Sequence, residues 1–470
     1  MMRFIDREVE LEFIEKKFNA SGAQFVVIYG RRRVGKTELI KQFCEGKNSL
    51  YFLADKRGTL LNVERFAQKA ADQLSDVVPK AENFYDFFRY LIQRIASERS
   101  VIVIDEFSYL MERDNTISSV FQVIWDEYLK DENVMLILCG SSVSMMVEGV
   151  LSQKAPLYGR RTGQWKLDPL KIYNAWEFHR DIGAERAVEF YSVTGGVPLY
   201  ILEFDAEKDV FENIREHILT KGEFLYDEAE TLLKEELRTY YLYLSIFEAI
   251  AMGKTRIVEI ADYSKIAQKD LPKYLTTLMK LELVGKEHPV TEKEQSKKTR
   301  YFVKDNFFRF YFKYIHPNKT EIESGNPDKV ISVIKRDFGS YVGKSFENVV
   351  YESLVRLNSL GRTPFSFTRI GRMWGKIPGK PKGENTYEID IVALNDATKE
   401  ILFVECKWKN RKTDVGVLEM LAEKSRFVKW NNAERKEYFA VFSKSGFTEK
   451  AYTYSEKNGV LLYTLEDVLR

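Results

Sequence analysis

The chain has 470 residues, which is too long for one ordinary core of about 100 to 200 residues and predicts roughly three domains. Its 44% hydrophobic and 30% charged content, with 11 Pro and 26 Gly, excludes long disordered, collagen-like or low-complexity segments. Basic residues (72) nearly balance acidic ones (70), yet residues 331–470 hold 24 basic and 18 acidic side chains. That asymmetry favours a polyanion partner for the C-terminal part, although a difference of this size also arises by chance.

Apolar runs stay shorter than the roughly 18 to 20 residues that a membrane span requires. The opening residues, MMRFIDREVELEF, carry acids where a signal peptide would be apolar, so we expect a cytoplasmic protein without a membrane partner. Cys44, Cys139 and Cys406 are far apart, and the four histidines stand singly. This pattern excludes a disulfide framework and a CxxC zinc site, and predicts that any metal, Mg²⁺ or Mn²⁺, is held by carboxylates.

The first 170 residues alternate helical patterns with short apolar runs. Each run is continuous, as is typical of a strand buried on both faces of a parallel sheet, and the helical segments suit crossover connections. We therefore predict an α/β nucleotide-binding core over residues 1–170. Its predicted strands are Phe25–Tyr29, Leu50–Leu53, Val101–Ile104 and Val134–Cys139.

The sequence GRRRVGKT follows the first predicted strand and precedes the helical segment TELIKQF, the context that a phosphate-binding loop requires. Its glycines let backbone N–H groups wrap phosphates, Lys36 can neutralise the β- and γ-phosphate charges, and the Thr37 hydroxyl can bind Mg²⁺. The sequence thus predicts an ATP or ADP site. The residues assigned to it are Gly30, Arg31, Arg32, Arg33, Val34, Gly35, Lys36, Thr37 and Glu38.

Two carboxylates, Asp105 and Glu106, follow the apolar run Val101–Ile104, at a strand end where ligands collect in open α/β sheets. We expect Asp105 to hold Mg²⁺ and Glu106 to act catalytically by polarising the attacking water. A further run, VMLILCGSS, ends in Ser141 and Ser142. Ser141 is placed to sense the γ-phosphate, and ordinary helix capping explains these serines equally well.

These motifs resemble the P-loop ATPases of the AAA+/STAND kind found mainly in archaea and some bacteria. The resemblance covers about residues 1–320, through FIDREVELEFIEKKF, the P-loop, IDEF, LCGSS, PLYGRRTG and TGGVPLYI. It implies that Arg7, Gly196 and Pro198 belong to the nucleotide pocket. It also implies that Arg160 or Arg161 stabilises charge during hydrolysis, although an Arg after a loop Gly is often an ordinary surface residue.

Residues 171–232 are helical and polar, interrupted where Gly195, Gly196 and Pro198 break a helix, and predict a helical lid. Residues 233–315 contain three helical patterns and a strand-like YFV, the order of a winged helix-turn-helix. The third helix directs Lys269, Lys273, Thr276, Thr277 and Lys280 outward. These side chains suit DNA contacts, and a regulatory or protein-binding surface fits them equally well.

Residues 316–340 are polar, contain Pro and Gly, and are predicted to form a linker. A second α/β unit is predicted over residues 341–470. Its elements are a helix (SFENVVYESLVRL), a basic loop, two strands (EIDIVAL and EILFVECKW), a helix over Val417–Phe427 and a strand (EYFAVFS).

Four charged residues of this unit form a candidate catalytic cluster. Glu405 and Lys407 lie two apart on one predicted strand, hence on one face, and hairpin pairing brings Asp390 close to them. With Glu347 from the preceding helix, these carboxylates can hold one or two divalent metals against a scissile phosphate. We expect Lys407 to position water or stabilise developing charge. The predicted metal ligands of the whole chain are Thr37, Asp105, Glu347, Asp390 and Glu405.

This cluster resembles that of the PD-(D/E)XK nuclease superfamily, and specifically the domain of unknown function that often follows this archaeal ATPase and is related to archaeal Holliday-junction resolvases. The resemblance covers about residues 341–470, through SFENVVYESL, IGRMWGK, EIDIVAL and VECKWK. The Pro of the short signature is absent, with Ile389 before Asp390, and the acids are all present. The resemblance implies metal-dependent DNA cleavage, but this fold also includes domains that only bind.

Six basic residues and no acids lie between Gly361 and Gly383, interleaved with Phe365, Phe367 and Trp374. The combination suits phosphate contacts and base stacking. A flexible charged loop with a core Trp is the alternative.

The sequence therefore predicts a multidomain α/β protein with a P-loop parallel-sheet ATPase core, a helical lid, a winged helix-turn-helix and a C-terminal restriction-endonuclease-like α/β domain. Its expected function is ATP hydrolysis coupled to Mg²⁺- or Mn²⁺-dependent DNA processing. The rival is a STAND-type regulatory switch whose last domain binds DNA or a protein without cleaving, and a transcriptional regulator is a third hypothesis. DNA is the expected partner, and an arginine supplied by a second copy would require a homo-oligomer.

Overall fold

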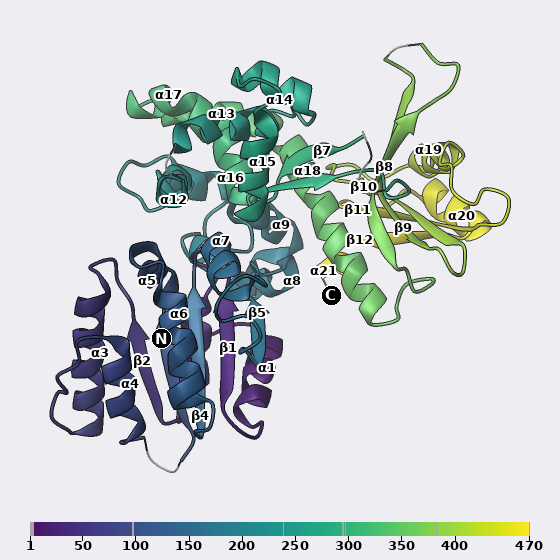
Figure 1. The fold of residues 1–470 in the computed structure, drawn as a ribbon. Helices are drawn as coiled ribbons and strands as arrows, with labels where there is room; N and C mark the ends of the chain where they lie inside the picture. The colour runs from purple at the N-terminus through teal and green to yellow at the C-terminus, as the bar shows by residue number, and fades with distance from the viewer. Residues whose placement is uncertain are drawn as a thin grey trace. The chain divides into compact units, whose positions relative to one another are not determined.

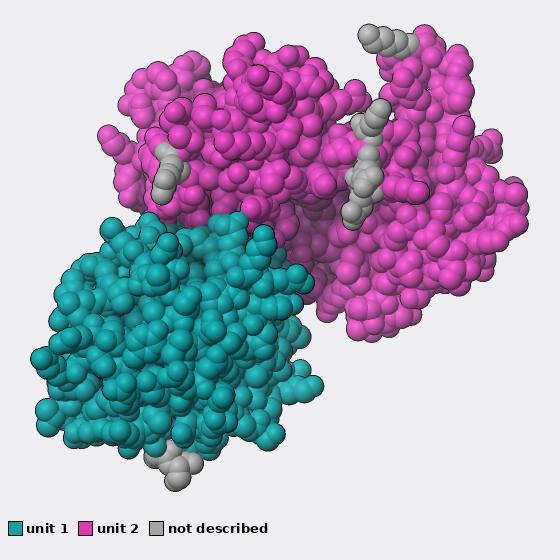
Figure 2. Space-filling view, in the orientation of Figure 1, with its two compact units in different colours: residues 1–169, 197–199 teal, residues 170–196, 200–470 magenta. Residues whose placement is uncertain are grey.

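The computed structural model of the chain describes residues 4–95, 98–237, 239–293, 296, 298–381 and 383–469. Figure 2 colours its two units: unit 1 comprises residues 1–169 and 197–199, and unit 2 comprises residues 170–196 and 200–470. Among the described helices, none combines the length and the apolar character that a bilayer crossing demands.

Unit 1 is built on a five-stranded sheet in the order β2-β3-β4-β1-β5 (Figure 1). Every pairing in it is parallel, so the predicted parallel-sheet core is confirmed. The strands are β1 (Gln24–Tyr29), β2 (Ser49–Leu53), β3 (Ser100–Asp105), β4 (Val134–Gly140) and β5 (Gly163–Lys166).

Helices cover both faces of this sheet. Val26 and Val103 pack with Leu39 of α2 on one face, whereas Phe25 and Ile102 pack on the other face with side chains of α3, α4 and α6. Successive strand residues point to opposite faces, which is why β1, β3 and β4 carry continuous apolar runs. The helices of unit 1 are α1 (Glu8–Phe18), α2 (Lys36–Cys44), α3 (Thr59–Leu74), α4 (Phe84–Ile92), α5 (Phe107–Arg113), α6 (Ile117–Ile124) with its π-helical continuation η1 (Trp125–Leu129), and α7 (Val143–Met146) with its continuation η2 (Val147–Leu151).

The sequence did not predict β5. Its four residues, GQWK, are only partly buried and include Gly163, so they carry no apolar run. The strand forms because its backbone pairs with the edge of β1, from Val26 opposite Gly163 to Tyr29 opposite Lys166.

The first part of unit 2 is helical, as predicted for residues 171–232. The turn between α9 and α10 requires Gly196, because a Cβ there would lie 1.8 Å from the carbonyl oxygen of Leu170. The elements are α8 (Ile172–Ala175), the 3-10 helix η3 (Trp176–Ile182), α9 (Gly183–Thr194), α10 (Pro198–Leu202), α11 (Val210–Asn213), the π-helical η4 (Ile214–Ile218) and α12 (Glu228–Glu236).

Three helices and a two-stranded antiparallel hairpin follow, in the order expected for residues 233–315. Leu271, Leu275 and Leu278 of the third helix are fully buried. Lys269, Lys273, Thr276 and Lys280 are exposed, as predicted, whereas Thr277 is partly buried. Glu294 and Lys297, in the loop of the hairpin, lie outside the described residues. The elements are α13 (Tyr240–Ala251), α14 (Ile257–Ser264), α15 (Leu271–Lys280), β6 (Val284–Glu287) and β7 (Arg300–Val303).

Residues 316–340, predicted as a linker, are helical. Pro327 occupies the first turn of α18 (Pro327–Ser359), where a missing N–H does no harm. Ile331, Ile334 and Phe338 then bury one face of that helix before residue 341, so its polar residues form the exposed face rather than a loop. The elements leading to α18 are α16 (Asn306–Phe310), η5 (Tyr311–Ile315), η6 (His316–Asn318) and α17 (Lys319–Glu323).

The C-terminal part contains a separate mixed sheet of five strands in the order β12-β11-β10-β9-β8 (Figure 1). The pairs β8–β9 and β9–β10 are antiparallel, and β10–β11 and β11–β12 are parallel. Its elements are β8 (Arg369–Lys376), β9 (Thr386–Asn395), β10 (Glu400–Lys407), α19 (Val415–Ser425), β11 (Lys436–Ser443), α20 (Glu449–Asn458), β12 (Val460–Thr464) and α21 (Leu465–Leu469).

The basic segment between Gly361 and Gly383 is not a loop throughout, because it contains β8. Met373 and Trp374 of this strand are buried, and the ladder with β9 runs from Arg369 to Lys376 with a bulge after Gly371. The alternation of Arg and Gly hides the strand in the sequence. Lys382 lies outside the described residues.

Candidate nucleotide site and candidate metal site

The P-loop connects β1 to α2 and has the backbone that phosphate binding requires. Gly35 adopts φ +95°, a left-handed conformation that favours glycine. A Cβ on Gly30 would lie 2.3 Å from the carbonyl oxygen of Leu167. Gly35 is therefore required by its backbone angle, and Gly30 is required because no side chain would fit beside Leu167.

Lys36 is the cation of this loop. Its side chain is buried, and Nζ donates hydrogen bonds to the carbonyl oxygens of Gly30 (3.0 Å) and Arg31 (2.9 Å). The ammonium group is thus held inside the loop whose backbone amides are suited to phosphate.

Asp105 lies at the end of β3 and is fully buried. Its Oδ2 accepts a hydrogen bond from the Thr37 hydroxyl (2.7 Å), and Oδ1 accepts one from the backbone N–H of Glu106 (2.8 Å). The Tyr51 hydroxyl also donates to Oδ2. Burial and the neighbouring Asp105 raise the pKa of Tyr51, which keeps the phenol a donor. The hydroxyl of Thr37 and this carboxylate are oxygen ligands of the kind Mg²⁺ prefers, so the residues present fit the predicted cation.

Glu106 follows in a left-handed conformation, with φ +54°. Its Oε2 accepts a hydrogen bond of 2.7 Å from the Ser141 hydroxyl, which comes from the end of the adjacent strand β4. Two predicted residues from distant parts of the sequence are therefore brought together beside Asp105.

Arg7 and Pro198 lie against the P-loop. The guanidinium group of Arg7 donates to the carbonyl oxygens of Val34 (3.0 Å) and Asp168 (2.8 Å). The Cγ of Pro198 is 4.0 Å from the place that a Cβ on Gly35 would occupy. Gly196 instead approaches Leu170, whose backbone N–H donates to its carbonyl oxygen (2.7 Å).

The remaining predicted nucleotide-site arginines have local partners. Arg160 makes a bidentate ion pair with Asp126, with N–O distances of 2.8 to 2.9 Å, and also donates to the carbonyl oxygen of Pro156. Arg161 lies over the Tyr158 ring at 5.1 Å, and Arg32 donates to the Tyr109 hydroxyl (3.2 Å). The charge-stabilising role of Arg160 or Arg161 stays a prediction.

The C-terminal cluster assembles as the strand period predicts. Asp390 on β9 lies beside the end of β10, where the backbone N–H of Cys406 donates to its Oδ2 (2.8 Å). The Lys407 ammonium group is 2.6 Å from Oε1 of Glu405. Burial, then the negative charges of Glu405 and Glu347, raises the pKa of Asp390 to about 7. Carboxylates brought this close favour a bound cation, so the residues present fit a divalent metal.

Glu347 reaches the cluster from α18 and is tied to two cations. It accepts from Arg372 of β8 and pairs with Lys344 at 2.9 Å. Arg372 in turn pairs with Glu287 of the β6–β7 hairpin at 3.3 Å.

Two residues of this cluster were missed by the sequence analysis. Lys424, in the last turn of α19, lies 3.1 and 3.2 Å from the two carboxylate oxygens of Glu405. Arg372 was assigned only to a basic loop. Leu421 and Ser425 of α19 are buried on both sides of Lys424 in the sequence, which indicates that this lysine borders the sheet, but nothing in the spacing connects it to Glu405.

The β6–β7 hairpin packs on the C-terminal sheet. Arg300 pairs with Glu388 at 3.0 Å, and its guanidinium lies 4.2 Å from the ring centroid of Trp374. The backbone N–H of Val290 donates to the carbonyl oxygen of Arg372 at 2.9 Å. Arg300 of this hairpin is therefore engaged within the protein.

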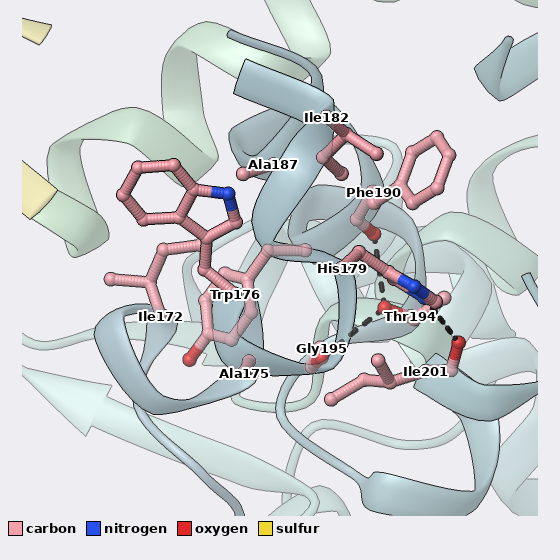
Figure 3. A pocket seen from close by; sticks show the side chains of 11 residues that line it. Ile172, Ala175, Trp176, His179, Ile182, Ala187, Phe190, Thr194, Gly195 and Ile201 are labelled. Atoms are coloured by element: carbon pink, nitrogen blue, oxygen red, sulfur yellow. Dashed lines mark hydrogen bonds between the residues drawn. The ribbon is translucent and has the colours of Figure 1, made fainter. Parts of the chain in front are cut away.

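A small pocket in the helical part of unit 2 is lined by Trp176, His179 and Phe190 (Figure 3). His179 Nε2 lies 3.1 Å from the carbonyl oxygen of Ile201. The pocket has a volume of about 20 Å³, room for roughly one water molecule, so it is not a nucleotide site.

The fold and the site of unit 1 define a P-loop ATPase domain, and comparison with known proteins agrees. Residues 4–204 match the family described as an ATPase domain predominantly from Archaea, and residues 311–418 match "Archaea bacterial proteins of unknown function". An uncharacterized protein of Methanocaldococcus jannaschii is 38% identical over 467 residues, which is 99% of each chain. The chain therefore belongs to the family that joins this ATPase domain to this domain of unknown function.

Two further matches cover a smaller part of the chain. An uncharacterized ATP-binding protein of the same organism is 53% identical over 47 residues, 10% of this chain and 80% of its own. A solved Walker-type ATPase of Pyrococcus abyssi is 20% identical, with a TM-score of 0.48, and the match covers 66% of this chain and 96% of that one.

Proposed function

We propose that the protein binds ATP with Mg²⁺ at the P-loop, hydrolyses it, and uses the nucleotide state to control metal-dependent processing of DNA by its C-terminal domain. The observation that carries the proposal is the presence of two built carboxylate sites in one chain, Asp105 with Thr37 and Asp390 with Glu405.

At the first site, Thr37 and Asp105 would hold Mg²⁺, which supplies neutralisation of the phosphate charge. The P-loop amides orient the phosphates, and Lys36 balances the charge that develops on them. Glu106 polarises the attacking water. Ser141 keeps the Glu106 carboxylate oriented through its 2.7 Å hydrogen bond, so this pair reports on the γ-phosphate.

At the second site, Asp390, Glu405 and Glu347 would hold Mg²⁺ or Mn²⁺, which supplies Lewis-acid activation of a phosphodiester. Lys407 positions the water or stabilises the charge on the scissile phosphate. The domain then belongs to the PD-(D/E)XK nuclease-like fold, and the three helices with the β6–β7 hairpin form a winged helix that connects it to the rest of the chain. This is why we assign DNA as the substrate.

The ATPase part is tested by phosphate release from ATP with wild type, Lys36→Ala and Glu106→Gln. Lys41→Ala is the matched control, because Lys41 lies on the same helix and is exposed. Loss of turnover in the first two variants alone supports the proposal. Equal ATP turnover in all four proteins would contradict the proposed roles of Lys36 and Glu106.

The DNA-processing part is tested with labelled linear, flapped and four-way DNA, Mg²⁺ or Mn²⁺, and ATP present or absent. Asp390→Ala and Glu405→Ala are compared with Glu419→Ala, an exposed acid of α19. Cleavage by wild type and by Glu419→Ala, with no cleavage by Asp390→Ala or Glu405→Ala, supports a nuclease. A dependence of this cleavage on Lys36 shows that the nucleotide controls it.

One observation favours a second function. Lys407 and Lys424 both pair with Glu405, so this carboxylate is already neutralised by protein cations. In that reading the chain is a STAND-type switch that holds ATP or ADP, and its C-terminal domain binds DNA or a protein partner, or a second copy of the chain, without cutting. Metal-independent DNA binding with no cleavage of any substrate would favour it.

A further inference from the structure

A basic cleft lies within unit 2, beside the carboxylate cluster. Its volume is about 410 Å³, and its walls come from α13, the segment α16–η5, α18 and the end of β10. Five cations line it, against one carboxylate, that of Glu347. The five are Arg309, Lys313, Lys344, Lys407 and Lys409.

The floor of the cleft is a helix that carries two glycines one turn apart, Gly339 and Gly343. Glycine destabilises a helix relative to alanine, so its use here needs a reason. A Cβ on Gly339 would meet no atom within 4 Å, and one on Gly343 would only touch the Cβ of Trp408, at 3.6 Å. The glycines therefore leave open space beside the helix and are not forced by close packing.

Three of the lining lysines are paired with acids of the protein. Lys313 pairs with Asp337 at 2.5 Å, and Lys344 and Lys407 pair with the two cluster acids Glu347 and Glu405. A cation bound by Glu347 and Glu405 would weaken the last two pairs and free both lysines for an anion. Arg309 donates to Ser345 and lies over the ring of Tyr341, and its buried Nε has no hydrogen-bond partner among the described residues.

We propose that this cleft binds a segment of single-stranded DNA by its phosphates and leads it to Lys407 and the carboxylate cluster. The inference rests on the proposed DNA-processing function and names the form of its substrate. A pocket of this volume accommodates a ligand of one or two nucleotides, whereas a duplex, whose major groove alone is about 12 Å wide, does not enter it.

The test is fluorescence anisotropy of a labelled oligothymidylate with the full chain in EDTA, so that binding is measured without cleavage. The charge variant is Lys313→Ala with Lys409→Ala. Its control is Lys450→Ala with Lys457→Ala, two exposed lysines of α20. We expect about tenfold weaker binding for the charge variant and a fall in the salt slope of about 1 to 2, with no change in the control.

A second variant keeps every charge. Gly339→Leu fills the open space beside α18 and improves helix propensity, so it should fold at least as well as wild type. We expect it to weaken binding of the oligothymidylate without lowering the melting temperature.

Three results would overturn the inference. The cleft variants could bind the oligothymidylate as tightly as the control, a duplex could bind equally well with the same dependence on Lys313 and Lys409, or millimolar inorganic phosphate could displace the strand fully, which indicates a small-anion site. Failure of the proposed function is distinguishable from these. If no DNA is cleaved but strand binding still depends on Lys313 and Lys409, the nuclease function is contradicted and the binding cleft is supported. If DNA is cleaved equally by wild type and the cleft variants, the nuclease function is supported and the cleft is contradicted.

Discussion

The two carboxylate sites differ in what holds their acids. Asp105 in unit 1 accepts hydrogen bonds from the hydroxyls of Thr37 and Tyr51 and from a backbone N–H. Glu405 in unit 2 is paired with the ammonium groups of Lys407 and Lys424, and Glu347 with Arg372 and Lys344. A carboxylate held by neutral donors keeps its charge for an incoming cation, whereas one held by lysines must exchange partners first. For the proposed function this difference means that Asp105 could take Mg²⁺ without giving up a charged partner, whereas a metal at the second site would have to displace lysine partners of Glu405 and Glu347.

The largest effect is expected at the first site. Asp105→Asn removes the charge at nearly constant side-chain size and turns one of the two accepting oxygens into a donor, so ATP turnover should fall by about 10² to 10³. Phosphate release measures it, and Asp131→Asn, an exposed acid in the turn before β4, is the control. ATP turnover by Asp105→Asn within a factor of two of wild type would contradict a role for the Asp105 charge at the first site.

The second prediction concerns the pH dependence of stability at the other site. Asp390 has its pKa raised from 3.8 to about 7, so the folded protein binds this proton more tightly than the unfolded chain. Its contribution to stability is therefore greatest below pH 3.8 and is lost as pH rises toward 7. In EDTA, Asp390→Asn should raise the free energy of unfolding by about 1 to 3 kcal/mol at pH 8 and by roughly a third of that at pH 5. Urea unfolding at the two pH values measures this.

Glu189 provides a control for that prediction. Burial, then the charge of Glu185, raises its pKa to about 7 as well, but the residue lies on α9 and no metal is proposed there. Added Mg²⁺ should stabilise wild type at pH 8 and should lose this effect in Asp390→Asn but not in Glu189→Gln. An equal Mg²⁺ response in both variants would contradict a metal site at Asp390.

A smaller effect is expected from Lys424. Removing it by Lys424→Ala takes away one of the two cations that compete for Glu405, so the metal concentration at half-maximal stabilisation should fall about two- to fivefold, as for an ion pair worth up to about 1 kcal/mol. Thermal unfolding across a Mn²⁺ titration measures it. A rise in that midpoint would mean that Lys424 assists metal binding instead.

The smallest expected effect is a change in stability when glycines of the two units are replaced by alanine. Gly343→Ala in α18 meets only ordinary contact and should stabilise the protein by about 0.5 to 1 kcal/mol, whereas Gly35→Ala, at φ +95°, should destabilise it and abolish ATP binding. Melting temperatures and nucleotide titration separate the two. Stabilisation by both substitutions would show that the P-loop glycine is not fixed by its backbone.

The sequence predicted elements whose pattern is local. The continuous apolar runs of β1, β3 and β4 and the P-loop are of this kind, and the strand period placed Asp390 beside Glu405 and Lys407. It did not predict β5, β8 or β12. The strand β5 depends on pairing with β1 rather than on apolar residues, and alternating Arg and Gly hide β8. Lys424 and Arg372 were missed for a related reason, since the contacts that bring them to the carboxylates span 19 and 25 residues.

The predicted linker over residues 316–340 was wrong for a different reason. Ile331, Ile334 and Phe338 carry the helical period, but the polar residues between them hide it in the sequence. The domain division at residue 341 therefore rests on composition alone, and the family match over residues 311–418 begins well before it.

Helix α18 has a practical consequence for separating the parts of the chain. Its 33 residues form a rod of about 50 Å, with Phe338 and Tyr341 packed among the preceding helices and Glu347 in the carboxylate cluster. Cutting the gene at codon 341 would sever this rod near its middle and separate Tyr341 from its aromatic partners Phe310, Tyr314 and Phe338. The C-terminal domain is consequently not a cassette that can be exchanged or expressed from that point, and a viable fragment has to begin upstream of Pro327.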